Sequence, residues 1–345
     1  MEPYTFDLKE TQHENSQKLF GQFDSYRTAY KHINSQPIHA IFIVPKHLPP
    51  GPRPLLVRFH GGGFCEGEAE GSMRPLYLNT LSKGPNRASF LELALKHGAV
   101  ILAPDYRLRP EHELAEGVDD IRSFWNWVEG GAQQVVQECI PDLELEVNNL
   151  LVCGESAGGY HAVQTVLLSM TTLLIKVLFL QYPAVDLASI FSLGRSNLGQ
   201  ESVKPPVLLP DIYPYSIVQD HLAAREPGKI CTRAKFGSRM ELMGALLLAD
   251  KMCDISGPNA WLDPMTSLET AGRLPPVLLY HSKEDDMIPW QHTEAFAEKL
   301  KRLHPDAPLY LTYNTGDHAF DGNHTMATPW LKEPLEFVQK YWPSG

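Results

Sequence analysis

The sequence predicts a doubly wound α/β fold, with a mostly parallel central sheet and helices on both of its faces. Two observations support this class. Short apolar runs recur along the chain, as in strands that are covered on both sides, and segments with helical spacing of apolar residues lie between them. With 345 residues, of which 43% are hydrophobic and 21% charged, the chain is long enough to bury a large core.

The parallel strands are expected at six apolar runs. These runs span residues 55–59, 100–103, 150–153, 175–180, 277–280 and 309–313. An earlier run, 38–44, is expected to enter the sheet as an antiparallel edge strand.

The helices are expected between the strands, where apolar residues recur at spacings of three and four. The clearest pattern contains Leu114, Val118, Ile121, Trp125 and Val128. A second contains Phe296, Leu300 and Leu303, and a third, with Leu335, Val338 and Trp342, predicts a closing C-terminal helix.

Residues 184–264 interrupt the alternation of strands and helices. Prolines at 205, 206, 210 and 214 punctuate their first half, and 240–252 has the pattern of an isolated helix. Ligands of open α/β sheets bind beyond the carboxyl ends of the strands, so an insertion after the strand at 175–180 is expected to act as a cap. The α/β core would then comprise 37–183 and 265–345, and the N-terminal segment 1–36 could add to the cap.

Charge and composition exclude several classes of protein. The net charge of -11 argues against a nucleic-acid partner. The first twenty residues lack the apolar core of a secretory signal, and no apolar stretch approaches a membrane span, so a cytoplasmic protein without membrane insertion is expected. The five scattered cysteines lack metal-ligand spacing, so we expect reduced thiols and no metal bound by them. Nothing in the sequence indicates an oligomeric state.

A candidate nucleophile follows the strand at 150–153. Residues 154–158 read Gly-Glu-Ser-Ala-Gly, and a helical segment comes next. This G-x-S-x-G pattern between strand and helix presents a serine on a sharp turn, where glycines permit the close backbone packing. Ser156 is therefore the predicted nucleophile.

A glycine-rich loop follows the strand at 55–59. It reads His60-Gly61-Gly62-Gly63-Phe64, and such a loop stabilises the oxyanion of a tetrahedral intermediate through backbone N–H groups. Gly62, Gly63 and Ala157 are the expected donors. The alternatives are a flexible loop or a phosphate-binding loop, but the latter would require a Lys-Ser or Lys-Thr ending that is absent.

The acid and the base are expected after the nucleophile, in that order. The loop that follows 277–280 contains Glu284, Asp285 and Asp286; Asp285 is the expected acid, and its two neighbours stay as alternatives. The loop that follows 309–313 contains His318, the expected general base, with His324 as its close rival.

Together these motifs resemble the hormone-sensitive-lipase-like family of α/β-hydrolases, which includes arylacetamide deacetylase and many bacterial and fungal carboxylesterases. The resemblance covers residues 38–185 and 270–342, and it includes the segment 105–111, Asp-Tyr-Arg-Leu-Arg-Pro-Glu. In that family the segment braces the oxyanion loop, which implies supporting roles for Asp105, Tyr106 and Glu111. A catalytic role for Asp105 is the alternative.

The chain departs from the family pattern at three positions. Glu155 stands where Asp is common, Arg109 where Ala is common, and Ala319 where Gly usually follows the histidine. None of these changes removes a reacting group.

The resemblance implies the α/β-hydrolase fold with a cap, and a serine esterase that cleaves a carboxylic ester through an acyl-enzyme on Ser156. We expect this chemistry to need no metal and no organic cofactor. The ester could be a thioester or lactone of a secondary metabolite, given a general likeness to fungal hydrolases. Two other classes remain as alternatives: a small-molecule receptor on a hydrolase scaffold, and a dehydratase or lyase that uses the same site.

Overall fold

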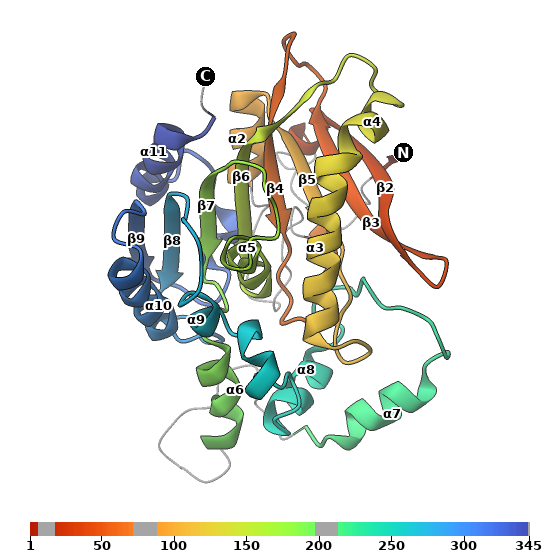
Figure 1. Cartoon of the computed structure of the whole chain (residues 1–345), viewed down its shortest axis with the longest axis vertical. Helices are drawn as coiled ribbons and strands as arrows, with labels where there is room; N and C mark the ends of the chain where they lie inside the picture. The colour runs from red at the N-terminus through yellow and green to blue at the C-terminus, as the bar shows by residue number, and fades with distance from the viewer. Residues whose placement is uncertain (6–17, 72–87, 197–212, 344–345) are drawn as a thin grey trace.

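A single nine-stranded sheet forms the centre of the molecule. The computed structural model describes residues 1–5, 18–71, 88–196 and 213–343. Within them the strand order is β1-β2-β3-β5-β4-β6-β7-β8-β9 (Figure 1). The strands are β1 (Glu2–Tyr4), β2 (Phe23–Ile33), β3 (Gln36–Pro45), β4 (Arg53–Phe59), β5 (Val100–Pro104), β6 (Leu145–Glu155), β7 (Ile175–Gln181), β8 (Val277–Ser282) and β9 (Leu309–Asn314). From β5 through β4 to β9 every pairing is parallel, which confirms the mostly parallel α/β sheet.

The antiparallel end of the sheet differs from the sequence-based expectation. β3, expected as an edge strand, pairs with β5 on one side and with β2 on the other, and β1 pairs outside β2. The edge position predicted for 38–44 is therefore wrong, and part of the segment 1–36 belongs to the sheet. β2 escaped detection because its sequence, FDSYRTAYKHI, is mostly half-buried and carries no apolar run.

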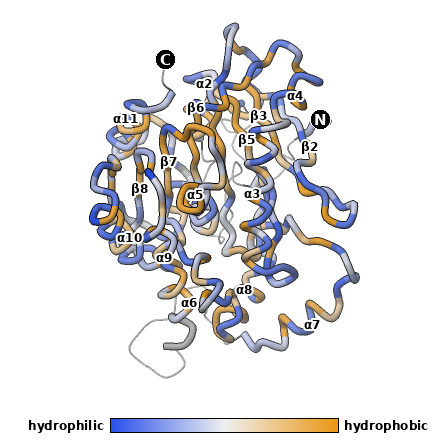
Figure 2. Tube along the Cα trace, in the orientation of Figure 1, coloured by the Kyte–Doolittle hydropathy of each residue, from blue (hydrophilic) through white to orange (hydrophobic). Residues whose placement is uncertain are grey.

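Helices cover both faces of the sheet. α3 (Leu114–Gly130), α5 (Ala157–Leu167) and α10 (Trp290–Leu303) pack on one face with strand residues such as Leu55 and Val57. α2 (Ala88–His97) and α11 (Lys332–Tyr341) pack on the other face with residues such as Leu56. The strands thus send alternate side chains into two cores. Figure 2 shows the central strands and α5 coloured as hydrophobic, as expected for elements that are buried in these cores.

Most of the shorter helices lie in the segment between β7 and β8. α6 (Leu187–Ser196), α7 (Ser216–Ala224), α8 (Met240–Leu248), η2 (Gly257–Leu262) and α9 (Pro264–Ser267) follow β7. α6, α7 and α8 gather at the lower end of the sheet in Figure 1, and α8 is the isolated helix predicted within 240–252. The remaining elements are α4 (Ala132–Gln137), η3 (Phe320–Asn323) and η4 (Pro329–Leu331). The prolines at 205, 206 and 210 lie outside the described residues.

Two further findings concern the described residues. Among the described residues, no helix is long and apolar enough to cross a membrane. The five cysteines, all within the described part of the chain, are free thiols.

Candidate active site

Ser156 lies on a strained turn between β6 and α5. Its φ of 51° is positive, which is rare for a residue with a side chain. The turn is held by hydrogen bonds from Ser156 N to Gln181 O (3.0 Å) and from Ala184 N to Ser156 O (3.0 Å). A side chain at Gly158 would collide with the carbonyl oxygen of Phe59. This is the geometry that the G-x-S-x-G pattern predicts.

The glycine-rich loop lies directly beside this turn. Gly62 has a φ of +112°, and a Cβ there would meet the carbonyl oxygen of Glu66, so only glycine fits. Gly61, Gly62 and Gly63 line one cavity together with Ser156. The structure therefore brings the loop predicted to donate N–H groups to the same space as the predicted nucleophile.

Residues of the segment 105–111 hold the loop from behind. The ring of Tyr106 stacks on His60 with centroids 4.2 Å apart, and its hydroxyl donates to the His60 carbonyl oxygen at 2.6 Å. Asp105 accepts a hydrogen bond from Ala69 N at 2.7 Å. Burial has the largest effect on the pKa of both His60 and Asp105. It lowers the pKa of His60 to about 4. It raises the pKa of Asp105 to about 7, although the hydrogen bond from Ala69 N opposes this shift.

His318 and Asp285 meet at the carboxyl ends of β8 and β9. His318 Nδ1 lies 2.7 Å from Asp285 Oδ2, and their side chains are 6% and 0% exposed. Asp285 is anchored by hydrogen bonds from Met287 N and Ile288 N to its Oδ1, at 2.9 and 2.8 Å. This carboxylate therefore contacts the imidazole while the loop backbone fixes its orientation.

The neighbouring candidates have other contacts. Glu284 accepts a hydrogen bond from Gly316 N at 2.8 Å, and Asp286 accepts one from the backbone N of His318 at 3.1 Å. His324 Nδ1 accepts from Trp330 Nε1 at 3.1 Å. Of the three adjacent carboxylates, Asp285 is the one placed against the His318 ring.

A second histidine, which the sequence reasoning missed, holds Asp285 from the other side. His281 Nε2 lies 3.1 Å from Asp285 Oδ2, and its Nδ1 lies 2.8 Å from Thr293 Oγ1 on α10. Burial alone would raise the pKa of Asp285, but the charge of a protonated His318 and the hydrogen bonds from both histidines lower it well below its ordinary value. Asp285 therefore stays ionised wherever an imidazole is needed as a base. His281 comes directly after a predicted strand and four residues before the acid. This position was the feature of the sequence that could have identified it.

The cavity over Ser156 is small and largely apolar. Its volume is about 30 Å³, room for about two waters. Besides the glycines, Ser156 and His318, it is lined by Glu66, Glu155, Tyr182, Phe236, Met240, Met243, Met287 and Ala319. Met240 and Met243 come from α8, so the region after β7 supplies part of the wall. Phe64, Tyr160 and Trp290, the large aromatic residues next to the catalytic motifs in the sequence, do not border this cavity.

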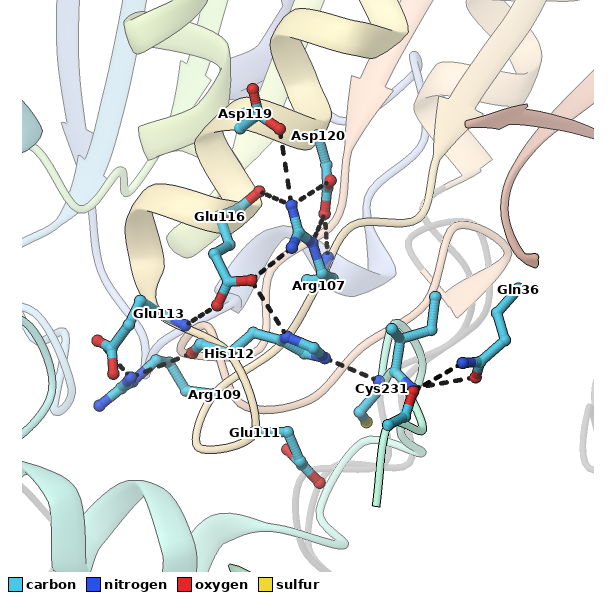
Figure 3. A network of polar contacts seen from close by, with 12 residues as sticks. Gln36, Arg107, Arg109, Glu111, His112, Glu113, Glu116, Asp119, Asp120 and Cys231 are labelled. Atoms are coloured by element: carbon cyan, nitrogen blue, oxygen red, sulfur yellow. Dashed lines mark hydrogen bonds and ion pairs between the residues drawn. The ribbon is translucent and has the colours of Figure 1, made fainter. Parts of the chain in front are cut away.

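Ion pairs tie the loop after β5 to its surroundings. Arg107 pairs with Asp120 and Glu116 on α3, as Figure 3 shows, with Nε–Oδ2 at 2.8 Å in the first pair. In the same view Arg109 contacts Glu113 (2.6 Å) and the carbonyl of His112. Glu111 instead reaches toward α8, where Arg239 Nη2 lies 2.8 Å from its Oε1 and Nη1 lies 2.9 Å from its Oε2.

Replacing Glu111 by glutamine is expected to lower the free energy of unfolding by about 3 kcal/mol, because it leaves a mostly buried Arg239 guanidinium without its carboxylate. Burial raises the pKa of Glu111, but hydrogen bonds from Arg239 and His221 outweigh it, so the pKa is lowered overall. A lowered pKa stabilises the fold above the unfolded value of about 4.3 and loses that effect as the pH falls. The difference from the wild type, measured by urea denaturation, should therefore shrink below about pH 4.5.

Glu113→Gln is the matched control, because the Glu113 side chain is 70% exposed in its pair with Arg109. Its expected cost is below about 1 kcal/mol. Equal destabilisation by the two variants would contradict a specific role for the Glu111–Arg239 pair.

Comparison with known proteins agrees with this architecture. A family model described as alpha/beta hydrolase fold matches residues 56–209, and a model of the prolyl oligopeptidase family matches residues 258–344. The probable carboxylesterase M8 of Phoma sp. is 26% identical over 94% of this chain and 98% of its own length. Tuliposide A-converting enzyme b1 of Tulipa gesneriana is 35% identical over 32% of this chain and 27% of that protein.

Solved structures show the same fold at low identity. A bacterial heroin esterase superposes with a TM-score of 0.59 at 18% identity, covering 98% of this chain and 93% of that chain. Esterase B of Lactobacillus rhamnosis superposes with a TM-score of 0.58 at 14% identity, covering 96% and 93%. Sheet topology, family model and structural relatives agree, and the chain therefore has the α/β-hydrolase fold.

Proposed function

We propose that this protein is a serine carboxylic ester hydrolase that works through an acyl-enzyme on Ser156. The observation that carries the proposal is the shared cavity: Ser156, the loop glycines and His318 border one space, and Asp285 holds the far nitrogen of the imidazole at 2.7 Å. The esterase names of its relatives point the same way.

The mechanism follows from these positions. With Nδ1–H donated to Asp285, His318 presents Nε2 as the base that takes the Ser156 proton. The serine oxygen then attacks the ester carbonyl, and the N–H groups of Gly62, Gly63 and Ala157 stabilise the oxyanion. His318 returns the proton to the leaving alcohol, and a water repeats the sequence to release the acid and restore Ser156.

The substrate is a neutral ester with a small apolar acyl group. Both oxygens of Glu66 accept backbone N–H groups, those of Gly237 and Arg239, and Glu155 pairs with Arg58. The acidic side chains at the cavity are thus engaged with protein partners, and the rest of the lining is mostly methionine and aromatic. A thioester or lactone passes through the same chemistry. The described parts of residues 184–264, from which Met240 and Met243 line the cavity, act as the cap. A cytoplasmic location stays a prediction.

The test is turnover of p-nitrophenyl acetate and butyrate, followed by fluorophosphonate labelling and peptide mapping. We expect hydrolysis and a single adduct on the peptide that contains Ser156. Ligand binding without turnover or labelling would favour a receptor instead. Product formation by elimination, with no acyl-enzyme, would favour a dehydratase or lyase.

Met243→Ala is expected to shift acyl preference toward longer chains. Met243 is 5% exposed, and its Sδ packs so closely on the glycine loop that a side chain at Gly63 would collide with it. Removing it makes room for two or more methylenes, each worth ~0.8 kcal/mol when buried. The ratio of kcat/KM for p-nitrophenyl octanoate to that for the acetate should rise at least about tenfold.

Met252→Ala is the matched control, because Met252 is equally buried but does not line the cavity. Its ratio should stay at the wild-type value. A common change in both variants would mean that loosening of the whole region after β7, and not the space beside Gly63, governs the preference.

A further inference from the structure

Behind the cavity, buried polar side chains connect the three loops that carry the predicted reacting groups. The connection begins at the glycine loop, where Gly61 N lies 3.4 Å from Glu155 Oε1. Glu155 precedes the nucleophile and forms an ion pair with Arg58 on β4. Arg58 Nη1 donates in turn to Gln181 Oε1 at 3.0 Å. These three side chains are at most 2% exposed, so the contacts form away from solvent.

The same connection ends on Asp321, three residues after His318. Asp321 accepts hydrogen bonds from Gln181 Nε2 and from the hydroxyls of Tyr280 and Tyr182, the last at 2.8 Å. It is 4% exposed, and a buried carboxylate is tolerated only where such donors compensate its lost hydration. Burial and the adjacent Asp321 charge raise the pKa of Tyr280 well above its ordinary value, so its hydroxyl stays a donor.

One of these donors also touches the imidazole. The rings of Tyr182 and His318 meet edge to face with centroids 4.8 Å apart. Tyr182 has a positive φ of 35°, a strained value for a residue with a side chain. Its backbone N donates to Tyr280 O at 2.8 Å. The hydrogen bond to Asp321 thus helps to hold Tyr182 in the orientation that supports the His318 ring.

Building on the proposed function, we propose that Asp321 is a positioning residue: by anchoring the histidine loop to Gln181, Tyr182 and Tyr280 it sets where the His318 imidazole stands relative to Ser156. Asp285 fixes one nitrogen of the ring, and a single hydrogen bond still allows the ring to shift with its loop. Asp321 removes that freedom. The hydrogen bonds and the ion pair of Gln181, Arg58 and Glu155 also connect Asp321 to the nucleophile turn and to the glycine loop.

The test compares Asp321→Asn with Asp120→Asn. Asparagine retains the shape of aspartate but places an N–H₂ group against donors, so the loop must shift. A displacement near 1 Å at a reacting group costs about 10²-fold, so we expect kcat for p-nitrophenyl acetate to fall ~10- to 100-fold with KM within about threefold. The rate of fluorophosphonate labelling should fall in parallel, because it also requires His318 to take the Ser156 proton.

Asp120 is the matched control because it is also a fully buried carboxylate with several donors, Lys31 and Arg107 among them, and it does not border the cavity. Asp120→Asn should lose thermal stability while its kcat stays within about twofold of the wild type. Tyr280→Phe is a milder second variant that keeps the ring and removes one donor to Asp321; we expect kcat about three- to tenfold lower.

Equal kcat losses in Asp321→Asn and Asp120→Asn would overturn the proposal, as would a raised KM with unchanged kcat. If Asp321→Asn does not fold, Tyr280→Phe decides the matter: wild-type kcat and labelling rate in that variant would refute the anchoring role. Wild-type protein without turnover or labelling would instead refute the proposed esterase function, so the two failures are distinguishable.

Discussion

Ser156→Ala is expected to reduce kcat/KM for p-nitrophenyl butyrate by about 10⁵- to 10⁶-fold and to abolish fluorophosphonate labelling. The methyl side chain cannot form the acyl-enzyme. The loop glycines and the cavity remain, so a small rate above that in water should persist from oxyanion stabilisation and binding. Stopped assays at high enzyme concentration, with mass spectrometry of the labelled protein, measure both quantities.

Ser267→Ala is a suitable control for this experiment. Ser267 is 3% exposed and its hydroxyl donates to Trp261 O at 2.6 Å, but it does not line the cavity. Its activity should match the wild type. Turnover in Ser156→Ala close to that of Ser267→Ala would show that another group carries the chemistry.

Asp285→Asn should lower kcat by about 10⁴-fold with little effect on KM. The amide retains the size of the carboxylate, but its N–H₂ can donate to His318 Nδ1 and so favour the tautomer that has its proton on Nε2, where a base is needed. The backbone contacts from Met287 and Ile288 to Asp285 Oδ1 should keep the loop in place. Circular dichroism and steady-state kinetics together separate this tautomer effect from unfolding.

Glu284→Gln and Asp286→Asn distinguish the three adjacent carboxylates. Each accepts a backbone N–H from the histidine loop, that of Gly316 or His318, and neither is placed against the imidazole ring. We expect losses of no more than about tenfold, from small shifts of that loop. A 10⁴-fold loss in either of these variants, with Asp285→Asn only mildly affected, would reassign the acid.

Local patterns were sufficient for much of this protein. The parallel strands and the principal helices could be predicted because a buried strand or an amphipathic helix displays its environment in its own residues. The turn at Ser156 and the glycine loop could be predicted for a similar reason, since close backbone approach excludes every side chain larger than hydrogen at positions such as Gly158. In contrast β2, where most polar and apolar residues alike are half-buried, carried no such signal.

The sequence by itself thus determined the fold class, the strand–turn–helix around Ser156 and the loops that hold the candidate acid and base. Only the tertiary structure decided which of three adjacent carboxylates meets His318. It also decided that His281 supports this carboxylate, and that Asp321 joins the histidine loop to β7 and β8. The physical reason is that burial and hydrogen bonding between residues far apart in the chain depend on the packing of the whole sheet. The identity of a side chain is local, whereas its partners are not.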